Sequence, residues 1–197
     1  MNEQALVRGT SRREMLKLSG MGMLAGVAAN ALTPAKAHAA AEAVDVVYAS
    51  WIHGHSMEVE YPDRIASQRR AGFWFDIEGK PGTGNWFHFA IPTPVLVNDA
   101  RLRIKKVALR FTTTSVDAFV RDVHVYDGEN RIAVFDEVYL SGDNWFADFV
   151  LPERPFIEWG LGISLGVGFG VEMMDHHMHF ISAGCDFTLQ EPEPVEV

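Results

Sequence analysis

The chain has 197 residues, of which 22% are charged, and its formal net charge is −9 at neutral pH. An acidic surface repels the phosphates of nucleic acids and of anionic lipids, so the composition argues against nucleic-acid partners. The single cysteine, Cys185, excludes an intramolecular disulfide. The fold therefore depends on its hydrophobic core, in which we expect Cys185 to be a small buried residue.

The first 39 residues have the features of an export signal. The stretch Ser11-Arg12-Arg13-Glu14-Met15-Leu16-Lys17 resembles the motif of twin-arginine (Tat) signal peptides, with Arg12 and Arg13 as the arginine pair. A Gly- and Ala-rich apolar run of about 15 residues follows, which is shorter than the roughly 20 residues of a membrane-spanning helix. Small residues at 35–39 then fit a signal-peptidase site.

The resemblance implies that residues 1–39 are cleaved and that the mature protein is periplasmic or extracellular, without stable membrane insertion. Residues 1–39 hold five of the 17 basic and two of the 26 acidic residues, which leaves 12 basic and 24 acidic residues and a net charge of −12. Tat clients fold before export, and many of them carry a metal or organic cofactor. A cofactor is therefore a reasonable expectation here.

The mature part is dominated by apolar residues that alternate with polar ones, the pattern of half-buried β-strands. Strands are predicted at 44–52, 57–61, 73–77, 85–91, 107–113, 117–126, 131–135, 144–151, 159–171 and 178–189. The Asp127-Gly128 turn joins two of them as a hairpin. These segments predict one all-β domain at 40–190, an antiparallel β-sandwich of jelly-roll type, followed by an acidic, disordered tail at 191–197.

Several finer expectations follow from the same alternation. Phe73 is placed on the core face together with Phe75 and Ile77. The only candidate for a helical turn is 65–70. In the last strand, the expected core-facing residues are Ile181, Ala183, Cys185, Phe187 and Leu189.

Segment 159–171 is unusual because its large apolar residues alternate with residues that have almost no side chain. The small-residue positions are Gly160, Gly162, Ser164, Gly166, Gly168 and Gly170. Because glycine weakens a strand, such a row requires an explanation. Either aromatic side chains such as Trp74, Trp86 or Trp145 lie over it, or the strand bends, or the row is a flat floor on which a ligand or another protein packs.

Five histidines form two clusters, one after the first predicted strand and one before the last. His53 and His55 make the first HxH pair, and His177 and His179 make the second, next to His176. Residues two apart on a strand point to the same side, so each pair can offer two imidazoles to one zinc or copper ion. The thioethers of Met173, Met174 and Met178 would suit copper(I). Alternatively, these are structural histidines.

No serine-nucleophile elbow, phosphate-binding loop or dinucleotide fingerprint is present in the sequence. The leading hypothesis is therefore a non-enzymatic binding or interaction module, whose partner is a protein or a small ligand. The second hypothesis is a metal-binding protein or metalloenzyme that uses His53, His55, His177 and His179. The third is a carbohydrate-binding module, which requires at least two exposed, coplanar Trp or Tyr rings.

Three stretches carry a resemblance to a known family: Tyr48 to Gly54, Glu78 to Gly82, and Asn85-Trp86-Phe87-His88. They look like a family of bacterial β-rich proteins that has no assigned activity. The resemblance covers most of the mature domain and implies no function.

Overall fold

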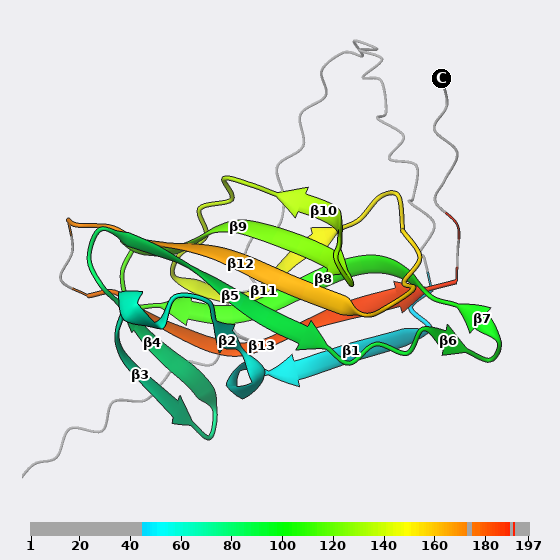
Figure 1. Ribbon diagram of the computed structural model, residues 1–197, viewed down its shortest axis with the longest axis horizontal. Coiled ribbons are helices and arrows are strands. Elements are labelled where there is room, and N and C mark those ends of the chain that lie inside the picture. The colour runs from blue at the N-terminus through cyan, green and yellow to red at the C-terminus, as the bar shows by residue number, and fades with distance from the viewer. Residues whose placement is uncertain (1–44, 173–174, 190, 192–197) are drawn as a thin grey trace, which may run out of the picture. The chain divides into compact units, whose positions relative to one another are not determined.

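The computed structural model describes residues 45–172, 175–189 and 191. They belong to one compact unit, Glu42–Val197, and form two antiparallel sheets that face each other (Figure 1). The predicted signal peptide and nearly all of the predicted tail lie outside the described residues. In the described part of the chain, no helix has the length and hydropathy needed to span a membrane.

Sheet A has six strands, and sheet B has five. Sheet A runs in the order β11 (Asp143–Val150), β8 (Arg103–Thr113), β13 (His177–Thr188), β4 (Trp74–Gly79) and β3 (Ile65–Ala71), with β1 (Tyr48–His53) also paired to β13. Sheet B runs in the order β10 (Asn130–Phe135), β9 (Ala118–Asp127), β12 (Leu161–Phe169), β5 (Thr83–Ile91) and β2 (Glu58–Val59). Short connections complete the fold: 3-10 turns η1 (Gly54–Ser56) and η2 (Pro62–Arg64), and the hairpin of β6 (Leu96–Val97) and β7 (Ala100–Arg101).

One strand, β13, organises sheet A. On one side it pairs with β8 along nearly its whole length. On the other side its first residues pair with β4 and its later residues pair with β1, so that β4 and β1 follow each other along the same edge (Figure 1). The first and last described strands are therefore neighbours.

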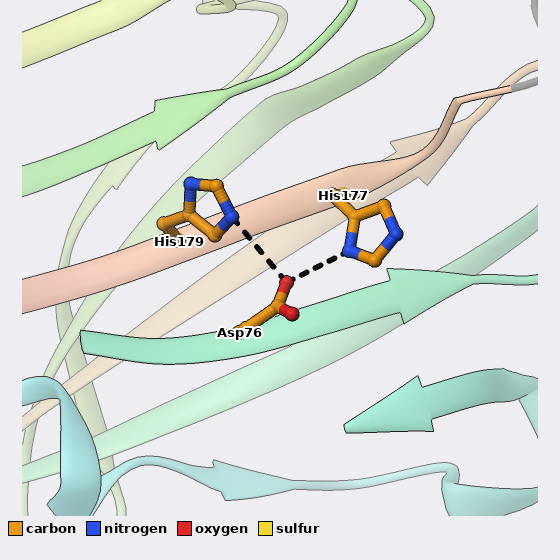
Figure 2. A group of neighbouring side chains, drawn as sticks. All are labelled: Asp76, His177 and His179. Carbon is orange, nitrogen blue, oxygen red and sulfur yellow. Dashed lines mark hydrogen bonds and ion pairs between the residues drawn. The ribbon is translucent and has the colours of Figure 1, made fainter. Parts of the chain in front are cut away.

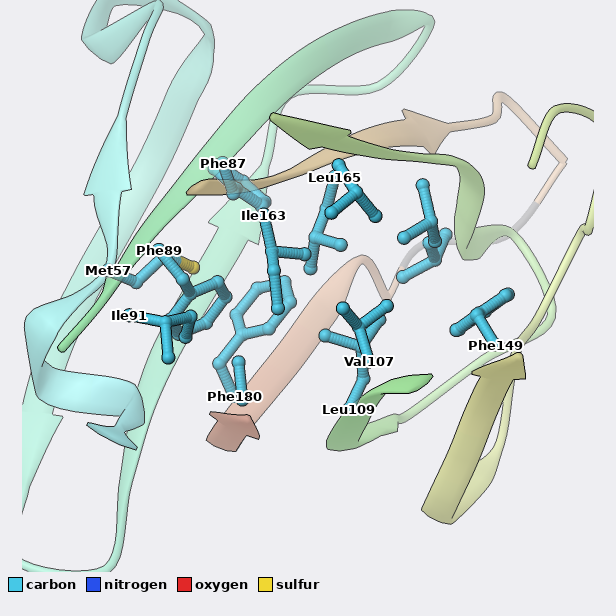
Figure 3. Packing of buried hydrophobic residues seen from close by; sticks show 14 of the residues in the cluster. Met57, Phe87, Phe89, Ile91, Val107, Leu109, Phe149, Ile163, Leu165 and Phe180 are labelled. Atoms are coloured by element: carbon cyan, nitrogen blue, oxygen red, sulfur yellow. The ribbon is translucent and has the colours of Figure 1, made fainter. Parts of the chain in front are cut away.

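The core lies between the sheets and is made by every second residue of the central strands. Phe87 on β5 and Phe180 on β13 are buried, and their rings meet edge to face at 5.2 Å (Figure 3). Cys185 is buried in the same cluster. Burial of each large apolar side chain contributes about 1.5–3 kcal/mol, and the core is continuous from Met57 to Phe149.

The predicted all-β sandwich is confirmed, and the chain changes sheet at most steps from β4 to β13, as in a jelly roll. The predicted hairpin is also confirmed, since Asp127 at the end of β9 pairs with Asn130 at the start of β10, which leaves Gly128 and Glu129 as the turn. Gly128 has a φ of 59°, a left-handed conformation that favours glycine in this turn.

Register irregularity overturns part of the predicted core. The pairing of β13 with β8 shifts between Phe180 and Ser182, so that inward-facing positions change parity there. Ala183, Cys185 and Phe187 are core residues as expected, but Ile181 is only half-buried and Leu189 is exposed. Met178 and Phe180 occupy the core before the shift. An irregularity of this kind leaves no mark in an alternating sequence.

The expectations at 65–70 and at Phe73 are wrong. Residues 65–71 form β3, an edge strand that pairs only with β4 and is therefore polar on both faces. Phe73 lies in the turn between these strands and is exposed. The strand predicted at 159–171 is shorter, and Trp159 and Val171 beyond its ends are also exposed.

Candidate metal centre

Four polar side chains stand together on the outer face of sheet A. In the antiparallel pairing of β4 with β13, Asp76 lies opposite His179 and Glu78 lies opposite His177. Their neighbours Ile77 and Met178 are buried in the core. Because side chains alternate along a strand, the burial of these neighbours places the acids and imidazoles on the outside.

Asp76, His177 and His179 converge on a small volume (Figure 2). Asp76 Oδ1 is 2.8 Å from His177 Nδ1 and 3.5 Å from His179 Nε2. One ligand atom from each residue lies within 4.8 Å of the others. Two imidazoles and one carboxylate form a donor set for a first-row transition metal, and the solvent side leaves further coordination positions open.

Two neighbours fix the ring of His179. The indole of Trp74 stacks on it with ring centroids 4.3 Å apart and an angle of 12° between the planes. The hydroxyl of Thr112, on β8, lies 3.1 Å from Nδ1. In the tautomer in which Nδ1–H donates to Thr112 Oγ1, the lone pair of Nε2 faces Asp76. Such outer contacts orient a histidine ligand in metal sites.

The two imidazoles have opposite protonation tendencies. Burial lowers the pKa of His179, and the charge of Asp76 only partly opposes this effect. Burial also works against protonation of His177, but the hydrogen bond to Asp76, followed by the charges of Asp76 and Glu78, outweighs it and raises the pKa. His179 therefore favours the neutral form that binds metals. The negative charges of Asp76 and Glu78, which favour a proton on His177, would equally stabilise a metal cation bound beside it.

Glu78 extends the cluster. Its Oε2 lies 3.9 Å from His177 Nε2, on the opposite side of the ring from Asp76. The side-chain exposed fractions are 32% for His177, 20% for His179 and 21% for Asp76. The cluster is therefore neither sealed in the core nor freely solvated, and an ion from solution can reach it.

The other histidine pair lies elsewhere. His53 pairs with Ser182, three positions beyond His179, which corresponds to about 10 Å along β13. The rings of His53 and His55 are in contact at 4.2 Å, and His55 Nε2 contacts the carbonyl oxygen of Ala71. Among the described residues, the group with metal-ligand geometry contains His177 and His179 but neither His53 nor His55.

The expected thioether ligands do not join this group. The side chain of Met178 faces the core and is fully buried. Met173 and Met174 lie outside the described residues. Asp76 is the member of this group that was not expected from the sequence, although its signal is visible: it is an acid on the polar face of an alternating strand.

The C-terminal half of the glycine row, from Gly166 to Gly170, is covered by side chains from β5, β9 and the residue before β9. A Cβ at Gly166 would lie 3.2 Å from the Trp86 ring and 2.6 Å from the Asp122 carboxylate. A Cβ at Gly168 would overlap the Phe119 ring, and one at Gly170 would overlap Asp117. The other end is more open: nothing lies within 4 Å of such an atom at Gly160, and at Gly162 the nearest atom is 3.8 Å away. Ser164 lies between these two regions.

Two exposed tryptophans are relevant to carbohydrate binding. Trp51 lies over Gly184 on sheet A, whereas Trp159 lies against Gly128 at the end of sheet B. Trp51 belongs to β1 of sheet A and Trp159 to the loop before β12, so the two indoles lie on separate parts of the surface. The side chain of Trp145 lies outside the described part of the structure.

The fold and the cluster define a β-sandwich protein with a histidine- and aspartate-lined site on one sheet face. The chain belongs to DUF6623, a family of unknown function, whose model matches residues 47–189. A comparison with curated proteins gives no match.

Solved structures with a similar course of the chain share little sequence with it. A low-affinity xylan-binding module, CBM86, from Roseburia intestinalis is 11% identical, with a TM-score of 0.44, and the alignment covers 72% of this chain and 96% of that one. The Stig cyclase Fisc from Fischerella sp. TAU is 12% identical, with a TM-score of 0.36 and coverage of 77% and 93%.

Proposed function

We propose that this protein is an exported metal-binding module, which holds a zinc(II) or copper(II) ion through Asp76, His177 and His179. The observation that supports it is the convergence of three ligand atoms within 4.8 Å on one sheet face. The twin-arginine motif at Arg12 and Arg13 fits export of a folded protein to the periplasm or beyond. We propose no reaction at this site.

The donor chemistry restricts the ion. Imidazole suits zinc and copper, whereas calcium and magnesium prefer sites made only of oxygen ligands. Among the residues that the structure describes near the site, Met178 offers no thioether, because its side chain is buried on the other face of β13. We therefore expect a divalent ion rather than copper(I).

The decisive experiment is elemental analysis of the protein purified without a His tag from its native exported fraction. We expect about one equivalent of zinc or copper in the wild type, and its loss in the His177→Ala/His179→Ala double variant. The matched control is His53→Ala/His55→Ala, which removes the other HxH pair and should keep the metal. Equal metal content in all three proteins, or a metal-free wild type that binds neither ion in calorimetric titration, would contradict the proposal.

A further inference from the structure

A second cluster of chemically active side chains lies on the outer face of sheet B. Ser164 on β12 pairs in register with His88 on β5, and His88 pairs with Glu58 on β2. Ser164 Oγ is 2.9 Å from His88 Nδ1, and His88 Nε2 is 3.0 Å from a carboxylate oxygen of Glu60. Carboxylate, imidazole and hydroxyl thus form one continuous hydrogen-bonded chain.

The proton order along this chain follows from the carboxylate. A hydrogen bond with the side chain of Tyr61, and to a smaller extent the contact with His88, holds the pKa of Glu60 below its usual value despite burial. Glu60 is thus ionised at neutral pH and accepts the proton of His88 Nε2–H. The lone pair of Nδ1 then accepts the Ser164 hydroxyl, which is the arrangement in which an imidazole acts as general base.

Ser164 is flanked by a second imidazole. On the other side of β12, His124 on β9 pairs in register with Ser164. Its Nε2 is 2.8 Å from Asp136 Oδ1, and its ring lies 4.9 Å from that of Trp86. The serine therefore has one carboxylate-bound imidazole on either side.

The glycines beside Ser164 determine how it can be approached. Gly166 is overhung by Trp86 and Asp122, whereas at Gly162 the nearest atom to an added Cβ is Cβ of Tyr126 at 3.8 Å. A ligand can therefore approach the hydroxyl from the Gly162 side. The carboxylates of Glu60 and Asp136 lie on the two flanks of this face, which disfavours anionic substrates.

We propose that Ser164 is an activated nucleophile and that this face of sheet B carries out acyl transfer from neutral carboxylic esters to water. Ser164 Oγ attacks the ester carbonyl carbon while its proton passes to His88 Nδ1. The bond from that carbon to the alkoxy oxygen breaks, and the leaving alcohol takes the proton back from His88. Water, deprotonated in turn by His88, then hydrolyses the acyl-serine to a carboxylic acid and free Ser164.

A backbone oxyanion hole requires free backbone N–H groups beside the nucleophile. At Ser164, β12 is paired in register with a strand on each side, so its backbone groups are engaged in the sheet and the site differs from hydrolases of that kind. We therefore expect slow turnover with activated esters, together with selective covalent capture of Ser164 by serine-directed reagents.

The test is labelling of the full chain with a neutral alkyl fluorophosphonate, which loses fluoride when a serine oxygen attacks phosphorus. Ser67 is an internal comparison, since its hydroxyl donates to the carboxylate of Glu78 at 2.8 Å without an imidazole. Peptide mapping should place the label on Ser164 and not on Ser67. The labelling rate of the His88→Gln variant should be lower by a factor of about 100 or more, which is the scale of general base catalysis.

Further measurements separate a chemical from a structural role. Ser164→Ala should keep the wild-type unfolding midpoint and lose both the label and the hydrolysis of p-nitrophenyl acetate. Equal labelling of Ser164 and Ser67, or an unchanged rate in a folded His88→Gln variant, would overturn the proposal. Chelators should not alter labelling, because the metal-binding group lies on sheet A.

Discussion

Trp74 lies flat against the imidazole of His179, with the two ring planes only 12° apart. The two residues belong to neighbouring strands of sheet A, β4 and β13. Stacking removes the freedom of the imidazole to rotate, so its nitrogens are held toward Thr112 on one side and Asp76 on the other. The indole is at the same time an optical reporter that touches a proposed metal ligand.

The first prediction uses this reporter. Binding of copper(II) at His179 should quench the fluorescence of Trp74, because a paramagnetic ion would then lie one ring away from the indole. The quenching in a copper(II) titration should be largely lost in Trp74→Phe and retained in Trp86→Phe, whose indole lies on sheet B. A titration curve unchanged by Trp74→Phe would place the copper elsewhere.

The second prediction concerns Thr112, which positions His179 without being a ligand. Thr112→Val keeps the shape of the side chain and removes the oxygen that lies 3.1 Å from Nδ1. Metal affinity measured by calorimetry should fall by about tenfold, as for other outer-shell contacts to histidine ligands. Thr83→Val, on β5 of sheet B, is the control and should leave affinity unchanged. The same loss in both variants would argue against a positioning role for Thr112.

The third prediction concerns Gly54, in the 3-10 turn after β1. A Cβ at this position would overlap the carbonyl oxygen of Phe180, a backbone atom of β13 that cannot move aside. Gly54→Ala should therefore lower the free energy of unfolding by about 3 kcal/mol. The measurement is urea denaturation. Gly72→Ala, where nothing lies within 4 Å of the added atom, should stay within about 0.5 kcal/mol of the wild type.

The fourth prediction concerns Asp127, whose carboxylate accepts hydrogen bonds from the backbone N–H groups of Glu158, Trp159 and Gly160 at 2.8–2.9 Å. Burial opposes ionisation of Asp127, but these bonds outweigh it and lower the pKa. Asp127→Asn places an amide donor against these donors and should cost about 2 kcal/mol of unfolding free energy at pH 7.

The pH dependence of that effect has a definite sign. A carboxyl whose pKa is lowered by folding stabilises the protein above its unfolded pKa of about 3.9, and this contribution is lost as pH falls through the folded pKa. The difference between wild type and Asp127→Asn should therefore be constant above about pH 5 and shrink below about pH 4. Glu129→Gln changes an exposed acid in the same turn and should show no such difference. A gap between wild type and Asp127→Asn that persists at low pH would contradict the assignment.

The sequence was informative where local pattern determines structure. The Asp127-Gly128 hairpin and the alternation of β12 follow from neighbouring residues, and both are confirmed. The helical turn predicted at 65–70 was wrong because an edge strand does not need an apolar face, so β3 lacks the alternation by which a strand is recognised. The parity change after Phe180 arises from an irregular register with β8, which depends on residues about 70 positions away in the chain.

The candidate sites show the same limit more sharply. The pairing of His177 with His179 follows from their spacing, but the contact between His177 and Asp76 joins residues 101 positions apart. His88 and Ser164 are separated by 76 positions, so neither suggests the other in the sequence. These contacts depend on the order of strands in each sheet, which alternation alone does not determine.

The shared edge of β13 has a consequence for how the chain folds during synthesis. β1, β4 and β8 all need β13 as a hydrogen-bonding partner, yet it is the last described strand to be made. While a ribosome still holds residues 177–188, the strands that precede them lack the segment that joins them into sheet A. Closure of the sandwich is therefore a late event that involves the whole domain, and such long-range pairing is intrinsically slow. A nascent chain stalled before residue 177 should remain sensitive to proteases along its entire length.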